Sequence, residues 1–236
     1  MFSIIIPCRN ETKTINNTTK KLFKKLNKFN IEIILINDFS EDNTYEELKK
    51  IKKKFKFVKI YNNKKKGLGG AINLGIKVSS AKYILIYMAD MSDDIEDIKK
   101  YFNICLKDQS IDAVFGSRFI KNSKVYKYPL KKLILNRVFN IFVKILFFSN
   151  YNDFTNAFKI YKKSVLIKMM PLISENFNIF LEMPLKLISR KYNYKIIPIK
   201  WRNRKKGKTK FKINELKSMY LFTLIYCYIE NKLLKE

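Results

Sequence analysis

The 236-residue chain contains no histidine, and its three cysteines, Cys8, Cys105 and Cys227, lie far apart in the sequence. A zinc site made of histidine and cysteine therefore cannot be built, and no histidine is available as a general base. Isolated cysteines, odd in number, do not form a disulfide framework, so a reducing compartment fits the sequence best.

Long apolar runs and targeting signals are also missing. No apolar run approaches the roughly 20 residues that a helix needs to cross a bilayer. The sequence enters an apolar, strand-like run at Ser3 with no basic segment or cleavage site before it, so we expect no signal peptide. We therefore expect a cytoplasmic protein that is either soluble or peripheral on the cytoplasmic face of a membrane.

Acidic residues are scarce, since 20 Asp and Glu stand against 49 Lys and Arg, a formal net charge of +29. A nucleic-acid-binding protein, a protein on an anionic membrane and an enzyme for phosphorylated substrates can all carry such a charge. The basic residues are spread along the chain rather than gathered in one tail, which weakens the nucleic-acid interpretation.

One cluster of acidic residues follows an apolar run. Residues 83–87 have the pattern of a buried strand, and Asp90, Asp93 and Asp94 follow it. Such a strand delivers side chains to the carboxyl edge of a sheet, where open α/β folds bind ligands. Asp93 and Asp94 fit the cap of the next helix, whereas Asp90 comes too early for that role. Asp90 is therefore the candidate metal- or phosphate-site residue.

Strand-like runs alternate with helical patterns through the first half of the chain. The expected strands are 3–6, 31–36, 58–61, 83–87 and 113–116, with a late strand at 195–199. This alternation predicts an α/β domain with a mostly parallel sheet, right-handed crossovers and flanking helices. The length of the chain fits one such domain with a small appendage.

Lysines and glycines meet at residues 64–71, where a helix is expected to begin. Backbone N–H groups at a helix N-terminus bind anions, so this segment is either a phosphate contact or a flexible turn. It is not a Walker A loop, because no Gly-Lys-Ser/Thr closes it. It is not the dinucleotide fingerprint either, because Gly67-Leu68-Gly69 lacks the third glycine and follows the third strand.

Two apolar helices are expected in the second half of the chain. Pro129 opens the first, in which 133–148 has twelve apolar residues of sixteen; its polar residues, Asn136, Arg137, Asn140 and Lys144, form a narrow stripe. The second carries 219–229, where only Thr223 is polar. Such broad apolar faces suit either burial or partial immersion in a membrane interface. Between the two helices, the basic run 201–210 is either a phosphate-binding loop or a solvated charge run.

Six segments, taken together and in order, resemble motifs of the family 2 glycosyltransferases, in particular the dolichol- or polyprenol-phosphate mannosyl- and glucosyltransferases. They are Ile6-Pro7-Cys8-Arg9-Asn10-Glu11, the acidic run 37–44, the glycine segment 66–75, Gly116-Ser117-Arg118-Phe119, the segment 153–159, and Arg204 with Gly207, Thr209 and Lys210. The resemblance runs from Ser3 to about Lys210.

The resemblance implies the A-type glycosyltransferase fold, a Rossmann-like sheet that binds a nucleotide-activated sugar and usually Mg²⁺ or Mn²⁺. It implies a catalytic domain over residues 1–214, with a nucleotide-sugar half (1–120) and an acceptor half (121–214). An amphipathic helix at 215–236 would follow. Nucleotide-sugar binding would fall to Pro7, Arg9, Glu11, Asp38, Lys66, Gly67, Ala89 and Asp90. Of these, Pro7 and Glu11 would line the base and ribose pocket, Asp38 would accept a hydrogen bond from the base, and Asp90 would hold the metal.

The sequence departs from the family at two places. Met88 stands where the first Asp of the Asp-x-Asp metal motif is expected, and Ser92 stands where Gln is usual. A single carboxylate can still hold a hydrated metal through the diphosphate, because Mg²⁺ keeps several waters. Asn156, Ala157 and Lys159 likewise replace the more usual Ser, Gly and Arg.

The resemblance implies an inverting displacement at the anomeric carbon of the sugar. A polyprenyl or dolichyl phosphate acceptor needs no strong base, and Arg118, Arg204, Thr209 and Lys210 would hold its phosphate. A hydroxyl acceptor on a lipid-linked or surface glycan would need a carboxylate base, for which Asp153 and Glu182 are the candidates; a capping or surface role for Glu182 is equally open. The partners would be the donor, the acceptor and an anionic membrane surface. A basic nucleic-acid-binding protein is the rival from another class.

Overall fold

The computed structural model describes residues 1–203 and 213–234. The strands of this part are β1 (Phe2–Cys8), β2 (Ile31–Asn37), β3 (Val58–Asn62), β4 (Tyr83–Ile86), β5 (Ala113–Ser117), β6 (Lys124–Tyr126), β7 (Lys159–Lys162), β8 (Tyr194–Pro198) and β9 (Lys200–Arg202). The helices are α1 (Ile15–Leu26), α2 (Thr44–Lys54), α3 (Leu68–Val78), α4 (Ile95–Lys107), α5 (Leu130–Leu146), α6 (Lys163–Lys168), α7 (Ile179–Ser189) and α8 (Ile213–Leu233).

The main sheet of the described residues has the strand order β3-β2-β1-β4-β7-β5-β8. Its strand pairs are parallel except where β7 lies between β4 and β5, to both of which it is antiparallel. The central strands are mostly apolar because helices cover both faces of the sheet. The predicted α/β class, with its mostly parallel sheet and flanking helices, is confirmed.

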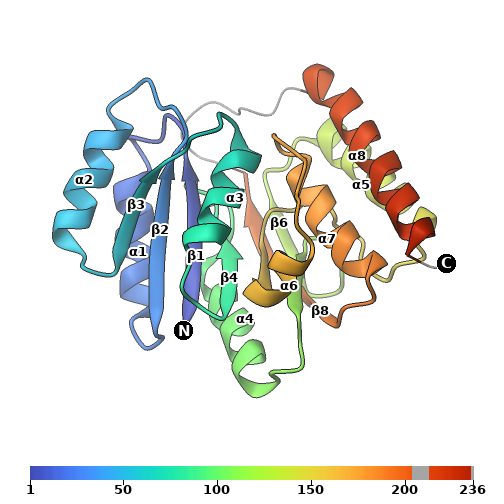
Figure 1. Ribbon diagram of the computed structural model, residues 1–236, viewed down its shortest axis with the longest axis horizontal. Helices are drawn as coiled ribbons and strands as arrows, with labels where there is room; N and C mark the ends of the chain where they lie inside the picture. The colour runs from blue at the N-terminus through green and yellow to red at the C-terminus, as the bar shows by residue number, and fades with distance from the viewer. Residues whose placement is uncertain (204–212, 235–236) are drawn as a thin grey trace.

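Helices cover both faces of the sheet (Figure 1), and one cluster of buried apolar side chains lies on each face. Helices α1, α2 and α4 pack on one face, where Ile4 and Leu35 point into one core. Helices α3, α5, α6, α7 and α8 pack on the other face, where Ile5 and Ile84 point into a second core. Neighbouring residues of one strand thus alternate between the two cores.

The structure corrects three details of the sequence analysis. Strand β7, in the middle of the sheet, was not expected, and neither was the small parallel pair of β6 and β9. The carboxylate of Asp94 caps α4 by accepting the N–H of Glu96, as expected. The same role for Asp93 was wrong, because that residue is buried and Asp94 alone occupies the cap position.

Helices α5 and α8 lie side by side at one end of the molecule (Figure 1), with edge-to-face contacts between Phe139 and Tyr220 and between Phe147 and Tyr228. The described residues do not bury the apolar face of α5, since only Asn140 and Val143 of this helix are buried. Large apolar side chains of both helices are exposed. Within the described residues, no helix is long and apolar enough to cross a membrane.

Candidate active site

The first part of the site lies where the direction of chain winding changes in the sheet. Strand β1 has β2 on one side and β4 on the other, so the loops after these strands meet at one edge. Open α/β sheets bind ligands in the crevice at such a switch point. Arg9 and Glu11 follow β1, Asp38 follows β2, and Asp90 follows β4.

Asp38 joins the end of β2 to the glycine segment before α3. One oxygen of its buried carboxylate, Oδ1, accepts the N–H of Gly67 at 2.9 Å and the amide Nδ2 of Asn63 at 2.7 Å. Gly67 has a φ of +122°, which a residue with a side chain rarely adopts. The backbone N–H of Gly67 is thus engaged within the protein, whereas the Lys66 side chain beside it is exposed.

The loop after β1 forms one wall of a cavity of about 400 Å³, lined by residues Asn10–Thr14 with Asp42 and Asn43. Glu11 is half-buried here; its N–H donates to Thr44 Oγ1 at 2.8 Å, and its carboxylate accepts the Thr14 hydroxyl at 2.8 Å. Pro7 is buried in β1, and Arg9 is half-buried just beyond it. The loop therefore has a fixed shape with polar groups at its rim.

Asp90 sits in a tight turn at the end of the β4 segment. Its Oδ1 accepts the backbone N–H of Ser92 at 3.0 Å and the Ser92 hydroxyl at 2.7 Å. The carbonyl of the buried Ala89 accepts the hydroxyl of Thr18 on α1 at 2.8 Å, which anchors the turn to that helix. The half-buried carboxylate of Asp90 is thereby held at the sheet edge.

The buried Asp93 lies close enough to Asp90 for the two charges to interact. Burial, together with the charge of Asp90, raises the pKa of Asp93 to about 8, although Arg118 opposes the shift. Within the described part of the chain, Asp93 Oδ1 has no hydrogen-bond partner. An acceptor without a donor, beside a second carboxylate, fits a cation at Asp90, and oxygen donors are those that Mg²⁺ and Mn²⁺ prefer.

No group of three or more metal-ligating side chains occurs among the described residues. These residues therefore do not enclose an ion on their own. They fit a hydrated ion that shares its coordination with substrate phosphates, which is the common mode for Mg²⁺.

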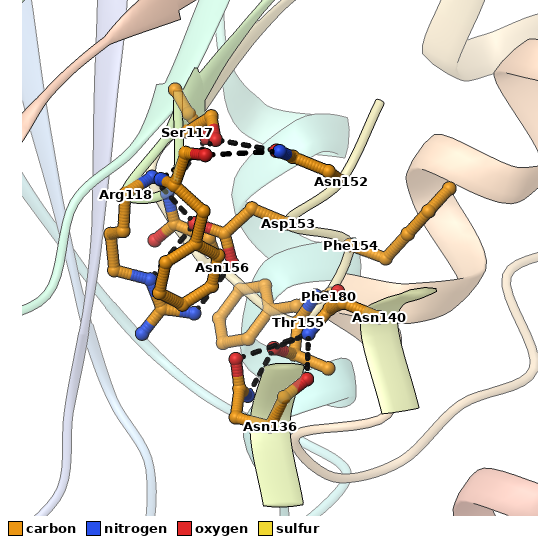
Figure 2. A network of polar contacts seen from close by, with 12 residues as sticks. Ser117, Arg118, Asn136, Asn140, Asn152, Asp153, Phe154, Thr155, Asn156 and Phe180 are labelled. Atoms are coloured by element: carbon orange, nitrogen blue, oxygen red, sulfur yellow. Dashed lines mark hydrogen bonds and ion pairs between the residues drawn. The ribbon is translucent and has the colours of Figure 1, made fainter. Parts of the chain in front are cut away.

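Arg118, directly after β5, forms a buried ion pair with Asp153 (Figure 2). The Asp153 carboxylate accepts the backbone N–H of Arg118 at 2.9 Å, Nε at 2.9 Å and Nη2 at 2.6 Å. Rings of Phe119, Tyr128 and Trp201 lie 5.1–5.6 Å from the guanidinium carbon. Burial disfavours the charged form, but Asp153 outweighs it and holds the pKa of Arg118 above its ordinary value. The result is a fixed cation in an aromatic surround.

Asn136 and Asn140 of the polar stripe of α5 point toward the segment that carries Asp153 (Figure 2), whereas Lys144 at the end of the stripe is exposed. Asn136 Nδ2 donates to Thr155 Oγ1 at 2.8 Å, and Asn140 Oδ1 accepts the N–H of Thr155 at 3.4 Å. The Arg137 guanidinium carbon lies 4.5 Å from the centroid of the Phe119 ring, over which Arg118 also lies. Arg137 Nη1 is buried and lacks a hydrogen-bond partner in the part of the chain that the structure describes.

Sequence reasoning noted Arg137 only as part of the stripe and assigned it no role. The available signal was its helical spacing, which placed it on one face with Asn136 and Asn140. That the stripe points toward Arg118 depends on how α5 packs, which the spacing does not fix.

The two carboxylates considered as general bases are fully buried and already engaged. Asp153 accepts three hydrogen bonds from Arg118, as described above. Glu182, on α7, accepts the N–H groups of Ile173 at 2.9 Å and Ser174 at 2.8 Å, and lies 3.4 Å from Lys186 Nζ. A surface position for Glu182 is excluded. Both geometries suit positioning roles better than proton abstraction.

Lys159, where the family more often has Arg, is buried in β7. Its ammonium donates to the carbonyl of Phe154 at 2.9 Å and also to that of Asn156. Burial lowers the pKa of Lys159 to about 7, and the nearby Arg118 adds to the effect while Asp153 opposes it. Lys159 therefore ties down the segment that carries Asp153 and Thr155. Arg204, Thr209 and Lys210, the remaining candidates, lie outside the described residues.

The sequence profile of the family described as "Glycosyl transferase family 2" matches residues 3–170. A dolichol-phosphate mannosyltransferase from Pyrococcus furiosus is 27% identical over 215 residues, which are 89% of this chain and 59% of that protein. A dolichyl-phosphate beta-glucosyltransferase from Dictyostelium discoideum is 29% identical over 188 residues, 73% of this chain and 57% of that protein. The chain thus spans less than two thirds of the length of these relatives.

Solved structures match the fold over almost the whole chain. Glucosyl-3-phosphoglycerate synthase from Mycobacterium tuberculosis, in complex with Mn²⁺, UDP-glucose and phosphoglyceric acid, has a TM-score of 0.72. The match covers 97% of this chain and 79% of that one at 13% identity. At this identity the likeness establishes the fold alone.

Proposed function

The chain belongs to glycosyl transferase family 2, and from that premise we propose that it moves a hexose from a GDP- or UDP-linked donor to a polyprenyl or dolichyl phosphate at a membrane surface. The observation that carries the choice of acceptor is the pair of arginines over the Phe119 ring. Arg118 is locked by Asp153, and Arg137 has a buried nitrogen without an acceptor among the described residues. Two guanidinium groups within 5.1 Å of the centroid of one ring, one of them with an N–H donor that lacks an acceptor in the described part of the chain, fit a phosphate.

The surroundings of this anion site favour a phosphate carried by a lipid. Arg137 belongs to α5, whose opposite face is apolar and exposed. We define the apolar surface as the exposed residues Leu130, Ile134, Leu135, Val138, Ile141, Phe142, Ile145 and Phe148 with Met219, Leu221, Phe222, Ile225, Ile229, Leu233 and Leu234. Exposed lysines, among them Lys131 and Lys132, border it and suit anionic lipid. A polyprenyl chain in the membrane could therefore present its phosphate to the arginines.

The donor would bind at the switch point, where the loops after β1, β2 and β4 meet. Glu11 and Asp38 would contact the nucleoside there, in agreement with their place on the loops. Arg9, Lys66, Gly67 and Ala89 stay predictions for this pocket. Phosphates of the donor would lie toward Asp90.

Asp90 would hold Mg²⁺ or Mn²⁺, with the buried Asp93 carboxyl behind it. The ion, when bound with the donor, supplies positive charge for the leaving diphosphate. Arg118 and Arg137 orient the acceptor phosphate, whose oxygen attacks the anomeric carbon and is already an anion near neutral pH. The bond between the anomeric carbon and the donor diphosphate breaks, and the nucleoside diphosphate leaves. Because the attacking phosphate oxygen carries no proton, no side chain must remove one. The engaged state of Asp153 and Glu182 agrees with this route more than with a hydroxyl acceptor.

Two linked measurements test the proposal. A thermal-shift screen of UDP- and GDP-sugars with and without Mn²⁺ identifies the donor, because a ligand that binds only the folded state raises the melting temperature. That donor is then incubated with a polyprenyl phosphate or with the same polyprenol without phosphate, and the products are identified by mass spectrometry. We expect product from the phosphate alone. Product from the alcohol, or from a glycan hydroxyl instead, would contradict the proposed acceptor.

A further inference from the structure

The segment between α6 and α7, residues 169–178, crosses to the beginning of α3; we call it the strap. The carbonyl of Glu175 accepts the N–H of Gly69 at 2.8 Å. A Cβ on Gly69 would collide with the carbonyl of Ser174, and one on Gly67 would lie 2.7 Å from the carbonyl oxygen of Glu175. Two of the glycines before and in α3 therefore serve a close approach of two backbones.

Two charged residues of α7 hold the strap from its other side. The Glu182 carboxylate accepts the N–H groups of Ile173 and Ser174, while the Lys186 ammonium donates to the carbonyls of Pro171 at 2.5 Å and Met169 at 3.4 Å. Both side chains are almost fully buried, with 0% and 1% of their surface exposed. Burying an ion pair seldom adds stability compared with apolar residues, so a pair that grips four backbone groups is best explained by the conformation it fixes.

The glycine segment links the strap to Asp38. Gly69 bonds the strap, and Gly67, two residues earlier, donates its N–H to the carboxylate of Asp38. Glu182, the strap, the glycine segment and Asp38 thus form one continuous series of hydrogen bonds and backbone contacts.

We propose that Glu182 is a positioning residue for donor binding, which fixes the strap against the glycine segment and thereby sets the place of Asp38. This inference rests on the proposed function, because it takes the switch point as the donor site. It gives Glu182 a role at a distance from the reacting atoms, in place of the base role suggested by the sequence.

The strap also contacts the helix that carries much of the apolar surface. Asn178 Nδ2 donates to Ser174 Oγ at 2.9 Å and to Thr223 Oγ1 of α8 at 2.9 Å. Thr223 is fully buried although α8 is exposed along its outer side. A change at Thr223 therefore loosens the strap without touching Glu182 or the donor pocket.

Glu182→Gln tests the proposal, because the amide keeps the shape but cannot accept two N–H bonds as a carboxylate does. Hydrogen exchange measured by mass spectrometry should speed up in peptides that cover the beginning of α3, where Gly69 bonds the strap. The KM for the donor that stabilises the wild type should rise about tenfold, the effect of one lost charge-assisted hydrogen bond, with kcat nearly kept. Thr223→Val should also raise the exchange rate at the beginning of α3 and the donor KM, each by a smaller factor. If Glu182→Gln does not fold, the Thr223→Val result tests the proposal in its place.

Glu32→Gln is the matched control. Glu32 is also buried, accepts a backbone N–H from Ser80 at 2.7 Å and pairs with Lys59 at 2.7 Å, but Ser80 follows the end of α3 whereas the strap contacts its beginning. Glu32→Gln should lower the melting temperature while leaving donor KM and exchange at the beginning of α3 unchanged. Unchanged exchange and donor KM in Glu182→Gln, or equal changes in Glu32→Gln, overturn the proposal. If the wild type binds no nucleotide sugar, the proposed function itself fails; wild-type binding that Glu182→Gln leaves intact overturns this inference alone.

Discussion

The two parts of the molecule on either side of Arg118 distribute charge and apolar surface in opposite ways. Before Arg118, the buried charged side chains are all carboxylates, such as Glu32 and Asp97, and few large apolar residues are exposed. From Arg118 onward, the described residues include three buried cations, Arg118, Lys159 and Lys186, beside two buried carboxylates, and most of the exposed large apolar residues. The surface of the first part is thus mainly polar. The second part combines fixed cations with an apolar exterior, which suits the phosphate group of a lipid such as the proposed acceptor.

The most drastic way to test the first part is Asp90→Asn. We expect a loss of sugar transfer of about a hundredfold or more, because removing one preorganised electrostatic group at a developing charge has effects of this size. The fold should remain intact, since the amide oxygen can still accept the hydrogen bonds from Ser92. Transfer assays and circular dichroism measure the two expectations.

Asp94→Asn serves as the control from the same loop. Asn is as good a helix cap as Asp, so α4 keeps its cap and the change of charge is identical. Full activity in Asp90→Asn, or an equal loss in Asp94→Asn, contradicts the role given to Asp90.

In the second part, Asp153→Asn should have the largest effect on stability. It leaves the buried Arg118 guanidinium without its counter-charge, and breaking one partner of a buried pair costs about 3–5 kcal/mol of unfolding free energy. Asp108→Asn, at an exposed pair with Lys195, should change it by less than about 1 kcal/mol. Urea denaturation compares the two variants. Similar losses in both would remove the distinction between buried and exposed pairs on which the comparison depends.

The fold could be read from the sequence where local pattern and burial coincide. Strands such as 31–36 are mostly apolar runs between helical patterns, so their parallel arrangement followed from alternation. Strand β7 escaped because it begins with a lysine, and a buried lysine in a central strand becomes intelligible only once the carbonyls of Phe154 and Asn156 surround it. Its antiparallel direction, unlike that of its neighbours, has no local signal in the sequence.

The candidate site was predictable in its residues more than in their roles. Asp90 stood out because an acid directly after a buried strand is unusual in so basic a chain. Asp153 and Glu182 were recognised as carboxylates near motifs, but their hydrogen-bond partners were not. Asp153 binds Arg118, which is distant in the sequence, and Glu182 binds backbone N–H groups that no sequence pattern reveals. The direction of the Arg137 side chain depends on which face of α5 packs inward. That Tyr220, Tyr226 and Tyr228 of α8 pack against the core likewise depends on how this helix is placed.

The apolar surface can be probed one residue at a time with Leu221→Glu. Leu221 is 57% exposed on α8, and placing a charge where a leucine enters lipid should reduce binding to vesicles with anionic lipid by about tenfold or more. Leu106→Glu, on α4 in the first part and 54% exposed, makes the same change of charge on the other side of the molecule. It should leave vesicle binding nearly unchanged in a sedimentation assay. Equal weakening by both substitutions would mean that net charge, not the apolar surface, determines binding.

The smallest effect is expected at Lys159, through the pH dependence of stability. The pKa of this buried ammonium is about 7 in the folded protein against 10.5 ordinarily, so from about pH 7 to 10 the unfolded chain binds more protons at this residue. The contribution of Lys159 to stability therefore rises with pH in that window, by about 1 kcal/mol between pH 7 and 8. Lys159→Met should remove this rise, whereas Lys24→Met, at an exposed lysine of α1, should keep it. Urea unfolding at pH 7, 8 and 9 measures the slopes. If Lys159→Met retains the wild-type slope, the ammonium is charged in the folded state. The second part of the molecule would then bury its cations with full charge, as Arg118 does.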